Sequence, residues 1–266
     1  MTIGWDALRA GELRELAAGL RSGRLSVPVS TLALQGCCEP EKAEWLAQTL
    51  AGIAADAVAL ATFLDLLAAE RERVDSAVRA VELVWTGPGA GGKPGRDTGA
   101  VVRELFSSAR RSVLVAGYAI HRGREVFATL ADRMAAVPDL QVRMIVDVPR
   151  RQGDTTIDID IVHRYATEFR QRNWPGGRLP EVLYDPRSLL QDQAARSAMH
   201  AKCIVIDAEV ALVTSANFTS AAQTKNIEAG TLVRLGGFAS QVQGRFDDLV
   251  RIGVFRPLPV TNGPST

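Results

Sequence analysis

Four polar side chains in the carboxyl-terminal third of this 266-residue chain are spaced so that they could act together on a phosphate. His200 and Lys202 lie two residues apart, as do Ser215 and Asn217, and in an extended chain this spacing puts both members of a pair on one face. The apolar runs on either side of Asp207 predict a hairpin that brings the two pairs together. The imidazole could then attack phosphorus, while the ammonium, hydroxyl and amide groups bind the phosphoryl oxygens.

Taken singly, each residue also has an ordinary structural interpretation. His200 could be a hydrogen-bonded core histidine, and Asn217 could cap the segment that follows it. Glu228, on a predicted strand, could be a surface charge. The combination of these groups with Lys202 is what favours a catalytic site.

At these positions the sequence resembles the phospholipase D superfamily. The motif of that family reads His-x-Lys-x4-Asp-x6-Gly-Ser-x-Asn, and the chain matches it at His200, Lys202, Asp207, Ser215 and Asn217. Thr214 stands where the family usually has glycine, and this larger side chain could tighten access near the floor of the pocket. Glu228 lies eleven residues past Asn217, where the family has an acid. The predicted catalytic set is therefore these five motif residues and Glu228, with Asp207 expected to be structural because it lies at the turn.

The resemblance implies a mechanism in which His200 attacks the phosphodiester and forms a phosphohistidine. Lys202 and Asn217 would stabilise charge on the phosphoryl oxygens, with Ser215 in support. A second imidazole would protonate the leaving oxygen and then activate water, while Glu228 would orient the attacking ring. Neither a metal nor another cofactor is implied, because cationic side chains supply the electrostatic stabilisation.

The family normally needs two such motifs in each active site, and this chain has one. His121 and His163 are the other histidines, and neither has a lysine two positions on. We therefore expect a homodimer whose two-fold axis places both copies of His200 in a shared site. The alternative is a monomer that uses His121 or His163 as the second imidazole.

Four further residues are candidates for nucleic-acid binding. Tyr118 and His121 lie at the end of one predicted strand, and Arg150 and Arg151 follow another. Residues 81–266 carry a net charge of +4, and only 4 of the 31 basic residues in the chain are lysines. Arginine suits phosphate recognition because its guanidinium binds two oxygens at once. Codon bias and ordinary solvated charges explain the same composition.

The elements that must position these residues fall into two parts. Residues 1–80 predict a helical domain, with helices over Asp6–Leu20, from Glu39-Pro40-Glu41, and over Ala57–Arg79 behind an Asp56 cap. From Val81, strands and helices alternate: strands at 81–85, 112–120, 141–148 and 179–184, and helices at 98–109, 124–136 and 159–172. This rhythm predicts an α/β fold, and the resemblance specifies a phospholipase-D-like mixed-sheet α/β sandwich over 81–255, followed by a tail at 256–266.

Several other classes are disfavoured. Gly91-Gly92-Lys93 is followed by Pro94, which lacks the hydroxyl that a nucleotide-binding P-loop needs for magnesium. No apolar run reaches the roughly 18 residues of a membrane span, and no signal peptide is evident at the start. The 3 cysteines do not form a disulfide framework. A reducing cytoplasm without a membrane is the expected location.

These observations favour a metal-independent phosphodiesterase acting on nucleic acid. The helical start and the segment Val84-Trp85-Thr86-Gly87-Pro88 also resemble the phospholipase-D-like components of bacterial DISARM anti-phage systems. That resemblance implies a role in phage defence beside helicase and methyltransferase partners. A non-catalytic nucleic-acid-binding subunit and a phospholipase or phosphatidyl transferase are the alternatives.

Overall fold

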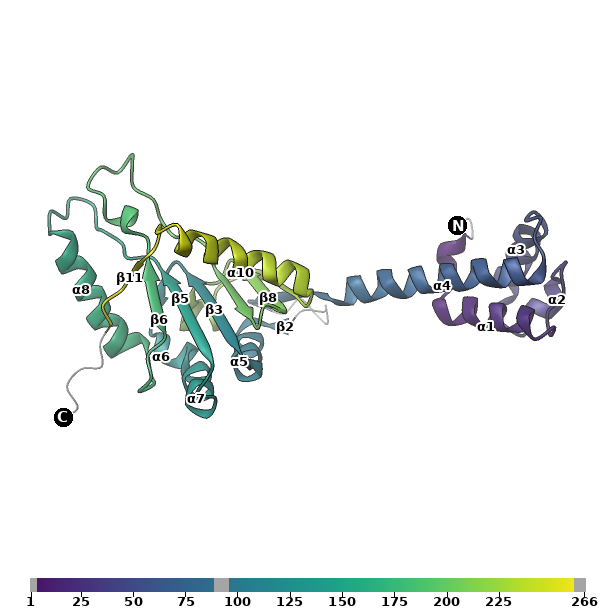
Figure 1. Ribbon diagram of the computed structural model, residues 1–266, viewed down its shortest axis with the longest axis horizontal. Coiled ribbons are helices and arrows are strands. Elements are labelled where there is room, and N and C mark those ends of the chain that lie inside the picture. The colour runs from purple at the N-terminus through teal and green to yellow at the C-terminus, as the bar shows by residue number, and fades with distance from the viewer. Residues whose placement is uncertain (1–3, 89–95, 261–266) are drawn as a thin grey trace. The chain divides into compact units, whose positions relative to one another are not determined.

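A computed structural model describes residues 4–88 and 96–260 of the chain (Figure 1). The chain divides into two compact units, Met1–Arg79 and Ala80–Thr266. The glycine-rich segment considered above as a P-loop, Gly91-Gly92-Lys93, lies outside the described residues. Among those described, no helix combines the length and the apolar character needed to cross a membrane.

The first unit is built of helices around an apolar core. Its helices are α1 (Ala10–Arg21), α2 (Thr31–Leu34), α3 (Pro40–Ala51) and α4 (Ala57–Arg79). The core is formed by buried leucines and alanines of these helices, among them Leu13, Leu16, Leu46 and Leu64. α1 packs along α4, which joins residues far apart in the chain.

Helix starts in this unit follow local chemistry. The predicted start of α3 is confirmed, with Pro40 at its first turn, where the missing N–H costs nothing. The Asp56 cap is also confirmed, since its carboxylate accepts the N–H of Ala59 at 2.8 Å. The expected helix from Asp6 starts later, at Ala10. Arg9 is extended there, and its N–H donates to Glu12 at 2.6 Å.

The second unit is an α/β unit around one large sheet. Its described residues form a nine-stranded sheet in the order β11-β6-β5-β3-β7-β8-β10-β1-β2. The strands are β1 (Val81–Thr86), β2 (Arg96–Asp97), β3 (Ser112–Gly117), β5 (Gln141–Val146), β6 (Glu181–Tyr184), β7 (Cys203–Ile206), β8 (Val210–Thr214), β10 (Glu228–Val233) and β11 (Arg256–Pro257). β3, β5 and β6 are parallel to one another, whereas β7, β8 and β10 run antiparallel to their neighbours. β1 is antiparallel to β10 and parallel to β2. A separate short pair joins β4 (Ile120–His121) to β9 (Phe218–Thr219).

Helices cover both faces of this sheet (Figure 1). The larger core, on one face, receives α5 (Thr98–Ser108), α7 (Ala128–Ala136) and α8 (Asp158–Glu168). On the other face α10 (Gly236–Arg251) packs over β7 and β8. Two short helices, α6 (Gly123–Val126) and α9 (Ser220–Thr224), complete the unit. The mixed-sheet sandwich predicted from the sequence is thus the observed fold.

Two predicted helices are interrupted. The helix expected over 124–136 is divided into α6 and α7 at Phe127, whose backbone is not helical. The helix expected over 159–172 leaves the α form after Glu168 and continues as a π-helical turn, Phe169–Asn173. Core packing explains the first break, because the Phe127 side chain is fully buried and contacts Phe106, Trp174 and Phe218.

The strand directions bring several chain segments to one edge of the sheet. Gly117 ends β3 opposite Val146 at the end of β5, and Ala116 pairs with Cys203 at the start of β7. The residues that follow β3 and β5 and those that precede β7 therefore meet at this edge, which places Tyr118, Asp147 and Lys202 in one neighbourhood.

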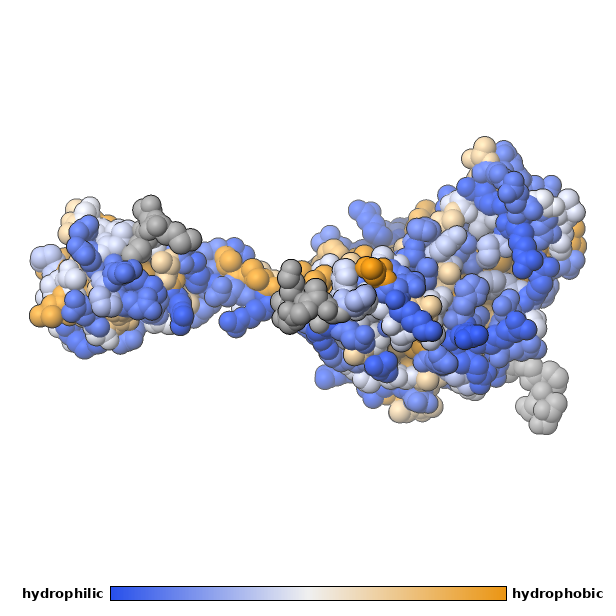
Figure 2. Space-filling view, turned by 180° about the vertical axis from the view of Figure 1, so that it is seen from behind, coloured by the Kyte–Doolittle hydropathy of each residue, from blue (hydrophilic) through white to orange (hydrophobic). Residues whose placement is uncertain are grey.

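Most of the α/β surface visible in Figure 2 is hydrophilic. An apolar strip is nevertheless exposed on β1, where Val81, Leu83 and Trp85 alternate with inward residues. Across the sheet Leu83 pairs with Thr231 and Thr231 with Val213, which is also exposed. We call Val81, Leu83, Trp85 and Val213 the apolar strip.

Candidate active site

His200 and Lys202 lie in the segment directly before β7 and form the centre of the site. The Lys202 Nζ is 3.2 Å from Nδ1 and 3.3 Å from Nε2 of His200. These nearly equal distances place the ammonium against the ring face rather than along the lone pair of one nitrogen. The ammonium is held there by donating to the His200 carbonyl at 3.1 Å.

The predicted hairpin is confirmed and brings the second half of the motif across from the first. β7 pairs with β8, and the N–H of Thr214 donates to the Lys202 carbonyl at 3.0 Å. Ser215 and Asn217 follow immediately after β8. The Asn217 Oδ1 is buried without a hydrogen-bond partner among the described residues, an uncommon cost that functional sites tend to keep.

Glu228 lies at the start of β10 and holds the end of the hairpin. Its carboxylate accepts a short hydrogen bond from the Ser215 hydroxyl and another, of 3.0 Å, from the Asn226 amide. The Ser215 hydroxyl in turn accepts the N–H of Ala229 at 3.1 Å. Orientation of the His200 ring by Glu228 stays a prediction, because the carboxylate contacts Ser215 and Asn226 in this structure.

Lys202 has an electrostatic environment that weakens its charged form. Burial lowers the pKa of the Lys202 ammonium below its usual value, and the negative charge of Glu228 opposes this only in part. The ammonium also lies 5.1 Å from the centre of the Tyr118 ring, a distance at which a cation is attracted to an aromatic face.

Tyr118, proposed from the sequence as a candidate for nucleic-acid binding, contacts the centre of the site. Its ring centre is 4.5 Å from that of His200, with the two planes tilted by 54°. The aromatic ring therefore forms one wall beside the imidazole. His121 lies three residues further, on β4, where it pairs with Thr219, so this segment runs from the imidazole toward the short β4–β9 pair.

Asp147 is a site residue that the sequence analysis missed. It directly follows β5, and its carboxylate accepts the N–H of Met199 at 3.0 Å, which holds the backbone next to His200. Burial raises the pKa of Asp147, and the charge of nearby His200 lowers it by less. The available signal was an acid immediately after the apolar run Met144–Val146.

Asp207 is not brought into the site. It lies at the β7–β8 turn with a φ of 55°, seven residues from His200, and an extended chain of that length spans about 23 Å. Its carboxylate accepts the backbone N–H groups of Arg110, Arg111 and Ser112 at 3.0, 2.7 and 2.8 Å. This supports the structural role expected for Asp207, as the anchor of β3.

The structure corrects the prediction that Arg150 binds nucleic acid. Its side chain is only 1% exposed, and its guanidinium donates to the carbonyls of Leu189, Asp154 and Thr156 and to the carboxylate of Asp158. A guanidinium with its donors so occupied is a structural cation. Arg151, the next residue, is exposed and lines a cavity together with His121.

Comparisons with known proteins identify the family of the chain. Residues 102–250 match the family model described as "Cardiolipin synthase, PLD-like domain". The chain belongs to the PLD-like family. A DISARM protein DrmC of Bacillus paralicheniformis is 31% identical over 156 residues, which make up 58% of this chain and 57% of that relative. The chain thus matches little more than half the length of this relative.

Two solved structures are similar to this chain, and the first of them shares its fold. Phosphatidylserine synthase of Haemophilus influenzae has a TM-score of 0.50 at 15% identity, over 70% of this chain and 40% of that one. The phospholipase D family member Nuc of Salmonella typhimurium has a TM-score of 0.42 at 18% identity, over 66% of this chain and 96% of that one.

The departure from the PLD-like motif at Thr214 is matched by a change across the sheet. Thr214 pairs with Gly230 on β10, and a Cβ atom at Gly230 would lie 2.9 Å from the Thr214 Cβ. The threonine thus occupies space that the opposite glycine leaves free. Its hydroxyl accepts the N–H of Ala216 at 3.0 Å, which supports the backbone that leads to Asn217.

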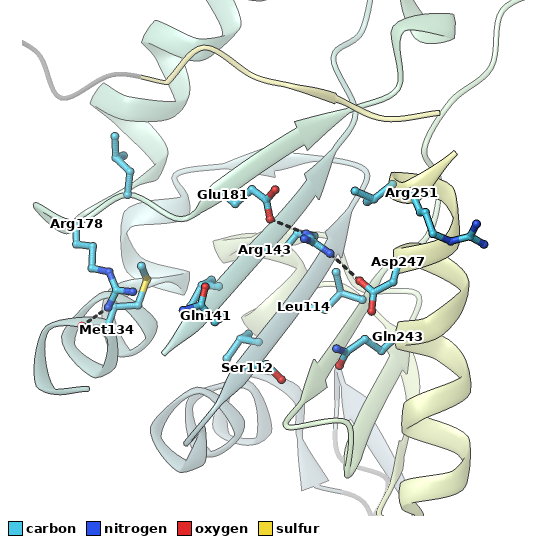
Figure 3. Close-up of a pocket in the computed structure, with 14 residues that line it drawn as sticks. Ser112, Leu114, Met134, Gln141, Arg143, Arg178, Glu181, Gln243, Asp247 and Arg251 are labelled. Atoms are coloured by element: carbon cyan, nitrogen blue, oxygen red, sulfur yellow. Dashed lines mark hydrogen bonds and ion pairs between the residues drawn. The ribbon is translucent and has the colours of Figure 1, made fainter. Parts of the chain in front are cut away.

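A cavity of about 610 Å³ (Figure 3) lies away from this PLD-like site. It is lined by Ser112 and Gln141, the first residues of β3 and β5, whereas the site lies past the last residues of these strands. The Arg143 guanidinium in this cavity is neutralised by Glu181 and Asp247, each at 2.6 Å. We therefore take the segment around His200, and not this cavity, as the candidate active site. In the part of the chain that the structure describes, no group of three or more His, Cys, Asp or Glu side chains could hold a metal ion.

Proposed function

We propose that this chain is a nuclease, a phosphodiesterase that cleaves nucleic acid through a phosphohistidine intermediate without a metal cofactor. The observation that carries the proposal is the contact between the Lys202 ammonium and the His200 ring. It puts a nucleophile and a cation close enough together to contact the same phosphodiester group. The match to the PLD-like family supports the same chemistry.

In the first step, a ring nitrogen of His200 attacks phosphorus, so that a P–N bond forms and the P–O bond to the leaving group breaks. The leaving oxygen takes a proton from a second imidazole. Lys202 and the amide of Asn217 stabilise the charge that develops on the phosphoryl oxygens. Ser215, held by Glu228, supports the same oxygens.

In the second step, water attacks the phosphohistidine. The second imidazole accepts a proton from this water, the new P–O bond forms, and the P–N bond to His200 breaks. The enzyme then returns to its starting protonation state. Tyr118 excludes water from one side of the ring and keeps the imidazole from turning away.

The second imidazole is proposed to be His200 of the partner subunit in a homodimer. The apolar strip supports this arrangement, because exposed apolar surface of this kind commonly marks a protein contact. Trp85 pairs with Ala229, the neighbour of Glu228, so a second copy seated on the strip would lie next to the site. Size-exclusion chromatography with light scattering is expected to give twice the chain mass, and a monomer would favour His121 or His163 as the second imidazole.

The biological setting is proposed to be anti-phage defence inside the cell, with helicase and methyltransferase partners of a DISARM system. The likeness to the DISARM protein DrmC supports this setting. Binding to a duplex should weaken as salt rises, with log K falling by about 0.9 per phosphate contact for each tenfold rise in salt. Affinity that does not depend on salt would argue against nucleic acid as the ligand.

The direct test is cleavage in the presence of EDTA. Bis(p-nitrophenyl) phosphate and end-labelled single- and double-stranded DNA and RNA are incubated with the wild type and with His200→Ala. We expect turnover by the wild type and a loss of at least about 1,000-fold in the variant. When the reaction is quenched early, we expect a phosphoprotein whose bond to phosphorus is labile in acid and stable in base. Binding without turnover of any substrate would identify a non-catalytic subunit, and cleavage of phospholipid vesicles alone would identify a lipid enzyme.

The shared site is tested by mixing subunits. A tagged heterodimer of one wild-type and one His200→Ala subunit is purified by two-step affinity chromatography. We expect it to be nearly inactive, because each active site would need both imidazoles. Half of the wild-type activity would show that each chain works alone.

A further inference from the structure

A cavity of about 380 Å³ lies between α8 and the segments that follow β3 and β5. His121, Arg151, Asp154, Tyr165, Glu168 and Asn173 contribute its polar lining. Its volume falls in the range of pockets that hold small organic ligands. The mechanism proposed above uses none of these side chains.

Three connections tie this cavity to the catalytic centre. Tyr118 contacts the His200 ring, and His121 is three residues further along the chain, at most about 11 Å from it. The N–H of Phe218, which follows Asn217, donates to Ala119 at 3.2 Å. On the other side, the carboxylate of Asp147 holds the Met199 N–H next to His200, and Arg151 follows Asp147 by four residues.

The lining of this cavity does not have the character of a simple phosphate site. Arg164, which also lines it, pairs with Asp154 at 3.5 Å, and Glu168 adds a further carboxylate. The cations are therefore offset by anions. Ile120 and Ile161, both buried, form apolar wall, which a phosphate would not need.

Two neutral donors of this cavity lack partners among the described residues. Asn173 is only 4% exposed, and its Oδ1 accepts the N–H of Gly123 at 3.1 Å, while its amide nitrogen has no acceptor there. The Tyr165 hydroxyl also has no hydrogen bond to those residues. Burial raises the pKa of the Tyr165 phenol, so it remains a donor at neutral pH. Neutral donors, carboxylate acceptors and an aromatic ring between apolar walls suit a planar heterocycle with its own donors and acceptors.

We propose that this cavity binds one unpaired nucleobase of the strand whose phosphate lies at His200. The inference rests on the proposed nuclease function and narrows its substrate to single strands or unpaired bases. A base in a duplex is stacked and paired, and it would have to leave the helix to enter, which costs free energy. A base in a single strand is already unpaired and enters at a lower free-energy cost, so a single strand is the preferred substrate.

The first test measures binding without cleavage. His200→Ala protein is titrated into fluorescently labelled 12-nucleotide single strands in which one abasic site is moved along the sequence. We expect one abasic position to weaken binding about 10-fold, since contact with a single base contributes on that scale. Equal affinity at every position would overturn the proposal.

The second test shows whether the weaker binding at one abasic position arises in this cavity. The double variant Arg151→Ala, Tyr165→Phe, which keeps the packed ring of Tyr165, is expected to abolish the position dependence. It should also lower the ratio of kcat/KM for a single strand to that for bis(p-nitrophenyl) phosphate about 10-fold. Arg172→Ala, an exposed arginine outside the cavity lining, is the matched control and should leave the ratio unchanged.

The outcomes separate this inference from the proposed function. If neither bis(p-nitrophenyl) phosphate, which carries no nucleobase, nor any nucleic acid is turned over, the nuclease proposal itself is refuted. Turnover of both substrate types, with a ratio that the double variant leaves unchanged, would refute only the base-binding cavity. Equal rates on a duplex and on its separated strands would refute it as well.

Discussion

Replacing Asp207 by alanine should destabilise the α/β unit while leaving the chemistry at His200 intact. The Asp207 carboxylate accepts three backbone N–H groups, from Arg110, Arg111 and Ser112, at 2.7–3.0 Å. Hydrogen bonds to a charged group contribute about 1.5–3 kcal/mol each, and water can replace part of that at the exposed amides. Alanine in the left-handed conformation of residue 207 adds about 1 kcal/mol. We therefore expect a loss of about 4 kcal/mol.

For a unit of this size, about 4 kcal/mol corresponds to a fall in Tm of about 8–16 °C. The assay combines thermal unfolding, followed by circular dichroism, with kcat measured at 20 °C, where the variant is still folded. We expect kcat within threefold of the wild type. A loss of about 1,000-fold in kcat with an unchanged Tm would refute the structural role and return Asp207 to the catalytic set.

Two control variants sharpen this measurement. Asp207→Asn tolerates the same backbone conformation and keeps one acceptor oxygen for Arg111 and Ser112, so its Tm should fall about half as far. Glu209→Ala removes only the exposed ion pair with Arg111 and should cost at most about 1 kcal/mol. If Glu209→Ala were as harmful as Asp207→Ala, general disruption of the turn would explain the result.

Three further predictions follow from the same contacts. Gly230→Ala should cost about 1–3 kcal/mol by overpacking against Thr214, and Thr214→Gly should recover part of that loss in a double-mutant cycle measured by urea unfolding. Because burial lowers the pKa of Lys202, kcat/KM should decline at a lower pH than an ordinary lysine would give, and the weaker Lys202→Arg variant should show no such alkaline decline in its pH profile. Because burial raises the pKa of Asp147, its ionised form costs stability at neutral pH. Asp147→Asn should therefore unfold at higher urea than the wild type at pH 8, with the difference shrinking as the pH falls toward 4, while the activity proposed for the chain decreases. Equal midpoints at pH 8 would contradict this.

Local features of the site could be predicted from the sequence because they depend on neighbours in the chain. The hairpin between β7 and β8 follows from two apolar runs around Asp207, and the pairing of Thr214 with Lys202 follows from its register. The Asp56 cap and the start at Pro40 are local in the same sense. Side-chain alternation was enough to put the halves of the motif together.

Contacts between distant segments could not be predicted in this way. Asp147 reaches the site through a hydrogen bond to a residue 52 positions away, so its neighbourhood in sequence reveals only an acid after a strand. Arg150 and Arg151 are adjacent and chemically identical, yet the guanidinium of Arg150 is buried against a carbonyl 39 positions away and Arg151 is exposed. Burial of a cation is decided by which distant groups satisfy its donors.

The amino-acid sequence by itself determined the alternating α/β architecture, the hairpin and the set of polar groups that the hairpin gathers near His200, because periodicity, turns and spacing act over a few residues. Tertiary structure alone decided which arginine is accessible, that Asp147 supports the imidazole segment, that Gly230 makes room for Thr214, and that a second cavity lies beside Tyr118. Each of these depends on how strands far apart in the chain align at one edge of the sheet, and that alignment is set by the packing of the whole core.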